Sequence, residues 1–279
     1  MDIPLGEDQL IDLSAVSDIF HAMQEVTVGS FPLSDVVGGG DPQYVAQEIV
    51  RAIRAHGLLT SPRSIIDIGC GCGRIATALT QVLPAEAQYI GVDIVPALIN
   101  FARERITPRF PHFRFVLLDE SNAFYDYYRQ AADAGHVSES TIRALDEAAP
   151  RNSIDMALSV SLFTHLDYPA AADLLSRLHR IMEPGGEAFI TVFLVDEHAR
   201  RTIKQGTTAF SFGHLSPSGK LLVDRPDEPT FAAAYEVPVL YELLKQTGFS
   251  LERIARGYWA DRSTGHTYQD VAIISKGAD

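Results

Sequence analysis

The residues of this chain best suited to hold a ligand are three glycines at alternate positions and an acid that follows them twenty positions later. The motif Asp67-x-Gly69-x-Gly71-x-Gly73 follows an apolar run rich in β-branched residues. Such glycines let the backbone pass close to a bound molecule and bring the N–H groups of the next helix beside it. A second apolar run, Tyr89–Val92, ends at Asp93, twenty positions after the last loop glycine (93 − 73 = 20). An acid there is placed to bind the hydroxyls of an adenosine ribose.

The glycine spacing separates two classes of adenosine-containing ligand. A dinucleotide site has the pattern G-x-G-x-x-G, whose third glycine would fall at position 74, where this chain has arginine. Asp67 would repel a pyrophosphate and attract a cationic amino group. With these residues the chain resembles the class I S-adenosylmethionine-dependent methyltransferases. The alternative is that the glycines only form a turn between two core strands and bind no ligand.

Two further segments extend the resemblance over roughly residues 41 to 279. Residues 178–186, ending in Glu183-Pro184-Gly185-Gly186, look like the helix-to-strand turn of small-molecule methyltransferases. Residues 159–166 look like the segment after the fourth strand of that family. Family members that methylate base amines commonly carry an Asn/Asp-Pro-Pro-aromatic motif there, and this chain has Ser159-Val160-Ser161-Leu162 instead. The resemblance therefore favours a small-molecule acceptor over a nucleobase.

The resemblance implies a set of cofactor-binding residues for S-adenosyl-L-methionine. It places Asp67 near the methionine amino group, the glycine loop along the cofactor, Asp93 on the ribose and Asp119 on the adenine amino group. Three acids at the tips of successive strands also suit the ligand-binding edge of such a sheet, although Asp119 could instead cap a helix. The full predicted set is Asp67, Gly69, Cys70, Gly71, Gly73, Asp93, Ile94, Asp119 and Ser159.

The acceptor side of the site is less specific in the sequence. His165 follows the predicted fourth strand, where it is a candidate general base because the pKa of histidine lies near neutrality. The alternative is that it hydrogen-bonds a helix end or the cofactor. Aromatic rings could hold an apolar or cationic acceptor, or simply pack in the core. The candidate substrate-binding residues are Tyr125, Tyr128, His165, Tyr235, Trp259 and Tyr268.

Alternating strand-like and helix-like segments predict an α/β, Rossmann-like, doubly wound fold. Seven strands are expected in a mostly parallel sheet, near residues 64–68, 89–92, 113–118, 154–160, 188–195, 249–256 and 267–275. The resemblance makes the last strand antiparallel. We expect an N-terminal helical lid over residues 1–40, followed by one methyltransferase domain over 41–279. Insertions are expected near 122–150 and 196–232.

Composition excludes several classes of partner. The formal charge is −13 and no basic run occurs, so nucleic acid and anionic membranes are poor partners. No apolar stretch approaches the roughly 18 residues needed to span a bilayer, and the N-terminus lacks a signal-peptide pattern, which predicts a cytoplasmic protein. Cys70 and Cys72 are too close for an ordinary disulfide and too few for structural zinc. No metal site is expected, and the sequence leaves the oligomeric state open.

The leading functional hypothesis is an S-adenosylmethionine-dependent methyltransferase acting on a small molecule, such as a natural product or an amino-acid-like compound. Its acceptor atom, whether O, N, S or C, is open. A nicotinamide-dependent oxidoreductase on a similar sheet is one alternative, disfavoured by Asp67 and Arg74. The other is a protein that binds the methyl donor without transferring the methyl group.

Overall fold

The computed structural model describes residues 10–28, 31–119 and 141–278. The described chain divides into two compact units. The described residues between Leu10 and Pro150, together with Ile154–Met156, form the glycine-loop unit. Residues Arg151–Ser153 and those from Ala157 onward form the C-terminal unit.

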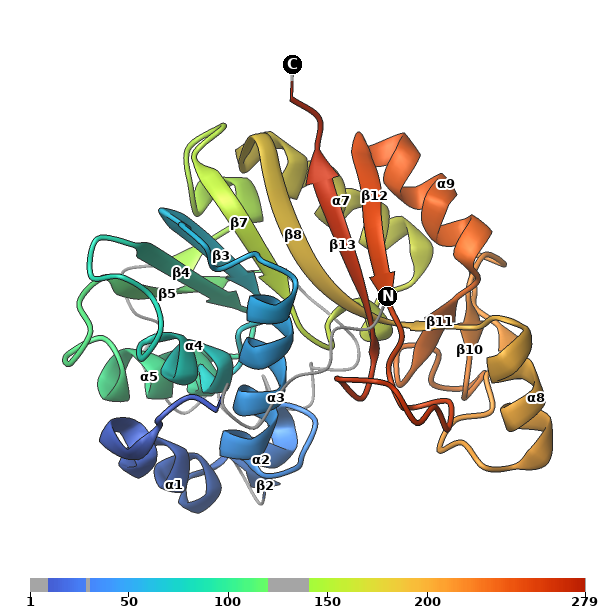
Figure 1. Ribbon diagram of the computed structural model, residues 1–279, viewed down its shortest axis with the longest axis horizontal. Helices are drawn as coiled ribbons and strands as arrows, with labels where there is room; N and C mark the ends of the chain where they lie inside the picture. Colours follow the sequence, from blue (N-terminus) through green and yellow to red (C-terminus); the bar gives the residue numbers. More distant parts are fainter. Residues whose placement is uncertain (1–9, 29–30, 120–140, 279) are drawn as a thin grey trace. The chain divides into compact units, whose positions relative to one another are not determined.

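The glycine-loop unit combines helices with a parallel sheet (Figure 1). Its helices are α1 (Ser17–Glu25), α2 (Leu33–Val36), α3 (Pro42–Ala55), α4 (Arg74–Leu79) and α5 (Pro96–Arg105). Its strands are the hairpin β1 (Thr27–Val28) and β2 (Phe31–Pro32), and the sheet strands β3 (Ser64–Ile68), β4 (Gln88–Asp93), β5 (Phe113–Leu118) and β6 (Thr141–Ile142). The sheet strands pair in parallel in the order β6-β5-β4-β3.

Local sequence explains how these elements begin. Asp41 caps α3 by accepting a hydrogen bond from the N–H of Tyr44, and Pro42 occupies the first turn, as the sequence predicts. The helices α1, α2 and α3 lie beside one another (Figure 1), and α1 also contacts α4. The described N-terminal residues therefore pack on the helices that flank the glycine loop.

Strand β7 (Ile154–Ser159) contributes its first half to the glycine-loop unit and its second half to the C-terminal unit. The other elements of the C-terminal unit are the 3-10 turn η4 (Phe163–His165), the helices α7 (Tyr168–Ile181), α8 (Glu197–Gln205) and α9 (Val237–Thr247), and the strands β8 (Met182–Leu194), β9 (His214–Leu215), β10 (Leu222–Val223), β11 (Ala233–Tyr235), β12 (Phe249–Ala255) and β13 (Asp270–Lys276).

The closing strands confirm the predicted antiparallel end of the sheet. β13 lies between β8 and β12 and runs antiparallel to both. The fold is therefore mixed α/β with a mostly parallel sheet, as predicted. The seven predicted strands correspond to β3, β4, β5, β7, β8, β12 and β13, while the described residues also form the short strands β6, β9, β10 and β11.

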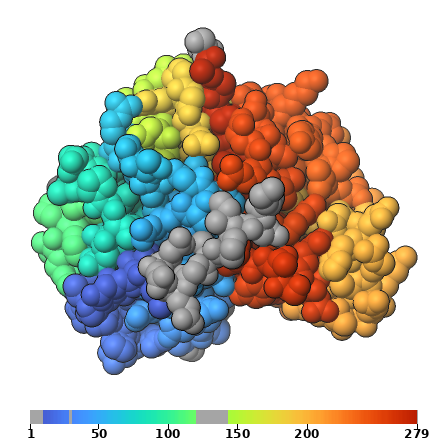
Figure 2. Space-filling model, in the orientation of Figure 1, coloured from blue at the N-terminus to red at the C-terminus, as the bar shows by residue number. Residues whose placement is uncertain are grey.

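Several element boundaries differ from the prediction, most of them by one to three residues. The largest difference is in β8, which begins at Met182, not at residue 188, and continues through Gly185 although that residue has a left-handed φ of 78°. The segment 196–232 contains α8 and two short strands. Most of α8 is exposed, and Figure 2 shows this region in yellow and orange on the surface of its unit. Among the described residues, no helix is long and apolar enough to cross a bilayer.

Candidate functional site

The glycine loop between β3 and α4 is held in a conformation that only glycine adopts readily. Gly69, Gly71 and Gly73 have φ angles of 76°, 56° and 84°, all in the left-handed region. The N–H groups of Gly69 and Cys70 donate to the carbonyl of Val92 at 2.9 and 3.1 Å. The alternation of glycines seen in the sequence is therefore a conformational requirement of this turn.

Space around the loop also requires glycine. A Cβ on Gly71 would lie 2.5 Å from Cγ1 of Val37, and one on Gly73 would lie 2.6 Å from Cδ1 of Ile106. Arg74, the first residue of α4, is buried and donates to the carbonyl of Gly39 at 3.2 Å. The segment Val37–Gly39 thus packs directly on the glycine loop.

Asp67 is a buried carboxylic acid at the end of β3, with 1% of its surface exposed. Its Oδ2 accepts a hydrogen bond from the Tyr89 hydroxyl at 2.5 Å. Burial raises the pKa of Asp67 to about 7, although the Tyr89 bond opposes that shift. Near neutral pH this acid is therefore poised between its protonated and ionised forms, and a nearby cation would ionise it.

Asp93, at the end of β4, connects the loop to its own strand. Its Oδ2 accepts from the N–H of Gly71 and its Oδ1 accepts from the N–H of Val95, both at 2.9 Å. Burial raises the pKa of Asp93, and these backbone hydrogen bonds oppose the shift. Each carboxylate oxygen retains a second lone pair for another donor. Asp93 therefore shapes the loop and still has capacity to accept from a ligand hydroxyl.

The remaining predicted cofactor residues lie at strand ends. Ile94 follows β4 and is half-buried, and Asp119 follows β5 and is exposed. Ser159, the last residue of β7, is buried and belongs to the C-terminal unit. Cys70 and Cys72 are free thiols, both buried, and burial raises the pKa of Cys72 to about 12. Both thiols are therefore protonated at neutral pH.

His165 ends the turn η4 in the C-terminal unit. Its Nδ1 lies 2.9 Å from the carbonyl oxygen of Thr230. A carbonyl only accepts, so Nδ1 carries the proton, and in the neutral ring Nε2 holds the lone pair. Burial lowers the pKa of His165 below 6.5. A neutral imidazole with this tautomer has the form that a general base needs.

Two of the aromatic candidates are core residues in this structure. Tyr235 is fully buried, and its hydroxyl donates to the carbonyl of Phe163 at 3.2 Å, which fixes η4. Trp259 is 3% exposed and packs with Phe193 and Phe212. Both side chains therefore pack in the core, which is the alternative to acceptor binding that the sequence leaves open. Tyr268 is half-buried at the edge of the same cluster, and Tyr125 and Tyr128 lie outside the described residues.

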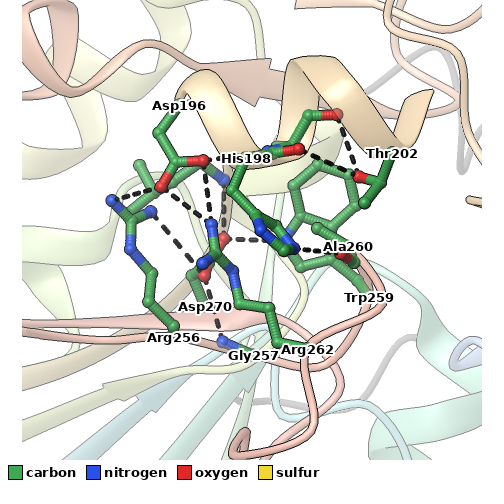
Figure 3. Close-up of polar contacts among 11 residues, drawn as sticks. Asp196, His198, Thr202, Arg256, Gly257, Trp259, Ala260, Arg262 and Asp270 are labelled. Carbon is green, nitrogen blue, oxygen red and sulfur yellow. Dashed lines mark hydrogen bonds and ion pairs between the residues drawn. The ribbon is translucent and has the colours of Figure 1, made fainter. Parts of the chain in front are cut away.

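A network of ion pairs fixes the loop that carries Trp259 (Figure 3). The indole N–H of Trp259 donates to Oδ2 of Asp270 at 2.7 Å. Arg256 forms ion pairs with Asp270 at 3.8 Å and with Asp196 at 3.1 Å. Arg262 donates to both carboxylate oxygens of Asp196 at 2.8 Å. Since Asp196 also caps α8, the network connects this loop to the segment that follows β8.

Comparison with known proteins identifies the family. A model described as a methyltransferase domain matches residues 41–254. The chain therefore belongs to this family, which confirms its resemblance to the class I S-adenosylmethionine-dependent methyltransferases.

Curated relatives match only parts of the chain. The trans-aconitate 2-methyltransferase of Methylobacterium radiotolerans is 27% identical over 170 residues, which cover 58% of this chain and 52% of that protein. The enzyme of the same name from Yersinia pseudotuberculosis is 38% identical over 65 residues, 23% of each chain. The chain thus spans about half the length of the first relative, and its match to the second covers about a quarter of that protein.

Solved structures support the fold. The 1,6-didemethyltoxoflavin-N1-methyltransferase of Burkholderia thailandensis, with bound 1,6-didemethyltoxoflavin and S-adenosylhomocysteine, matches with a TM-score of 0.53 at 19% identity, covering 99% of this chain and 93% of that one. The magnesium protoporphyrin IX methyltransferase of Synechocystis PCC 6803, with bound S-adenosylhomocysteine, matches with a TM-score of 0.52 at 16% identity and covers 95% of both chains.

Two of the hydrogen-bonded pairs in these units carry no signal in the sequence. Tyr89 reads as an ordinary strand residue, yet it is the hydrogen-bond partner of Asp67. Thr191 and Gln269 are 78 positions apart and share a hydrogen bond, which no local pattern indicates.

Proposed function

We propose that this protein binds S-adenosyl-L-methionine at the glycine loop and transfers its methyl group to a small molecule. The observation that carries the proposal is the left-handed glycine loop bound to Asp93, beside the buried Asp67, in a chain of the methyltransferase family. In this proposal, Asp67 faces the ammonium group of the donor, and Asp93 accepts hydrogen bonds from the ribose hydroxyls. Asp119 is the residue to meet the adenine amino group.

The loop hydrogen bonds also favour this donor over a dinucleotide. A pyrophosphate is usually bound by backbone N–H groups of its glycine loop. Here the N–H groups of Gly69, Cys70 and Gly71 already donate within the protein. A sulfonium amino acid needs acceptors for its ammonium group, which carboxylates and carbonyls provide.

Transfer of the methyl group is an in-line displacement at carbon, in which the acceptor attacks and the sulfonium leaves as a neutral thioether. Much of the rate can therefore come from holding the two reactants in line and excluding water. His165 is the candidate to accept a proton where the acceptor must lose one, because its Nδ1 is held by Thr230 and the neutral ring has its lone pair on Nε2.

The curated relatives suggest where a search for the acceptor should begin. They are named for methylation of trans-aconitate, a small polycarboxylate. We therefore propose carboxylic acids as the first acceptors to test, ahead of other natural products and amino-acid-like compounds. The residues 1–40 are proposed as a lid, since Val37 and Gly39 contact the glycine loop and Arg74.

Calorimetry tests the donor site directly. The protein is titrated with S-adenosylhomocysteine and, separately, with NAD. Binding of the first and not the second is expected, and the reverse would favour an oxidoreductase. Release of S-adenosylhomocysteine from S-adenosylmethionine across a panel of small molecules then tests transfer. Tight donor binding without turnover on any acceptor would favour a binding protein that does not methylate.

A further inference from the structure

Ser161, two residues after β7, adopts a conformation that serine rarely takes. Its φ is 62°, in the left-handed region. Hydrogen bonds hold it there from three directions. Its N–H donates to Oγ1 of Thr191 at 2.7 Å, its carbonyl accepts from Thr164 at 2.9 Å, and its hydroxyl donates to Gln269 at 3.3 Å. Strained residues that are fixed in this way are concentrated at functional sites.

The same hydrogen bonds orient the amide of Gln269. The Thr191 hydroxyl accepts from the N–H of Ser161, and it donates to Oε1 of Gln269 at 2.5 Å. Ser161 donates to the same oxygen. An amide oxygen has two lone pairs and no hydrogen, so Oε1 of Gln269 accepts from both hydroxyl groups. The NH2 group of Gln269 is therefore turned away from Thr191 and Ser161.

That NH2 group is available for a ligand. Within the described part of the chain, the hydrogen bonds of the Gln269 side chain to Ser161 and Thr191 both fall on Oε1, and the side chain is half-buried rather than enclosed. Gln269 immediately precedes β13, which pairs with β8 so that Asp270 lies opposite Val192. Ser161 follows the carboxyl end of β7, and Asp270 lies near the carboxyl end of β8. Ligands of open α/β sheets bind outside the carboxyl ends of the strands.

Resting on the proposed function, we propose that Gln269 binds the methyl acceptor by donating from its amide nitrogen to a carboxylate or carbonyl oxygen of that molecule. Thr191 and Ser161 are positioning residues that keep the donor side of the amide outward. A fixed donor selects an acceptor with an oxygen at that point and disfavours one with an ammonium group there, since two donors would face each other.

Matched acceptors test this specificity. The protein loaded with S-adenosylhomocysteine is titrated with trans-aconitate and with benzoate, benzamide and benzylamine, the last three sharing one skeleton. Wild-type protein is expected to bind a carboxylate or the amide and not the amine. Gln269→Glu, which has nearly the same shape, is expected to weaken carboxylate binding about 10- to 100-fold, the range for a lost hydrogen bond to a charged group. The same variant should improve binding of the amine.

Two variants of Thr191 separate positioning from folding. Thr191→Val removes the hydroxyl that orients Gln269 and should reduce discrimination between benzoate and benzylamine, whereas Thr191→Ser should retain it. Affinity for S-adenosylhomocysteine and the melting temperature are measured for each variant. If wild-type protein binds S-adenosylhomocysteine but no carboxylate or amide, or if Gln269→Glu leaves the preference unchanged, the proposal is wrong. Failure to bind S-adenosylhomocysteine would instead contradict the proposed function.

Discussion

The hydroxyl of Tyr89 donates a 2.5 Å hydrogen bond to the carboxyl group of Asp67, and both groups are buried. This bond supports the ionised form of an acid whose pKa burial raises to about 7. The charge on Asp67 near neutral pH thus depends on a residue of the neighbouring strand.

Tyr89→Phe should raise the pKa of Asp67 further, since the variant removes the bond that lowers it. A protonated Asp67 attracts an ammonium group less, so affinity for S-adenosylhomocysteine should fall at neutral pH. In the wild-type protein the ligand's ammonium group should ionise Asp67 on binding, which releases a proton. Affinity should therefore rise as the pH increases toward 7 and this rise should move to higher pH in the variant. Calorimetry at several pH values measures both effects. If binding to the wild-type protein releases no proton, then Asp67 does not interact with the ammonium group.

Asp93→Ala should weaken binding of S-adenosylhomocysteine by at least about tenfold, because hydrogen bonds to a charged group contribute about 1.5–3 kcal/mol each. It should also lower the melting temperature, because the N–H groups of Gly71 and Val95 lose their acceptors. The 2′-deoxy analogue of the ligand separates the two roles. Wild-type protein should bind this analogue more weakly than the natural ligand, while Asp93→Ala should bind the two alike. Equal discrimination by both proteins would leave Asp93 a purely structural role.

Gly71→Ala should destabilise the protein and weaken donor binding, since the added Cβ would meet Val37 at 2.5 Å and the residue has a φ of 56°. Gly185→Ala is the matched control. It shares the left-handed backbone, with a φ of 78°, but its Cβ would meet nothing within 4 Å. The control should cost about 1–2 kcal/mol of stability and leave donor affinity unchanged. Adding Val37→Ala to Gly71→Ala should recover part of the lost stability. An unaltered affinity in Gly71→Ala would mean that the loop does not approach the donor.

His165→Ala should lower kcat about 10²- to 10⁴-fold if His165 is a general base, with little change in donor affinity. His165→Asn provides the control, because its amide nitrogen can replace Nδ1 as the donor to Thr230. If the asparagine variant recovers the activity, then His165 acts only by donating its hydrogen bond to the Thr230 carbonyl. Because burial lowers the pKa of His165 below 6.5, the wild-type rate should decline on the acid side of that value. A rate independent of pH there would reject the base role.

Much of the glycine-loop unit could be predicted from local sequence. β3, β4 and β5 are short apolar runs bounded by turn residues, and Asp41-Pro42 marks the start of α3, so propensity and pattern agree. The start of β8, in the C-terminal unit, is harder to predict, because proline and glycine residues such as Pro184 and Gly185 usually end an element. The short strands β9 and β10 depend on antiparallel pairing with each other and with β11.

The polar contacts of the C-terminal unit could not be predicted in this way. Ser161, Thr191 and Gln269 are brought together by strand order, from positions 30 to 108 residues apart. Trp259 reads equally well as a pocket residue or a core residue. Its packing against Phe193 and its bond to Asp270 assign it to the core here.

The segment between β8 and β11 is attached to the elements around it at several points, including the ion pairs of Asp196 and the packing of Phe212 on Trp259. His165 holds the carbonyl of Thr230, and Asp167 accepts from the N–H of Ser218 and from the hydroxyls of Ser216 and Ser218. Between these anchors, most residues of α8 are exposed. Substitutions on this exposed face should therefore change the surface of the C-terminal unit while leaving its points of attachment and its folding stability nearly unchanged.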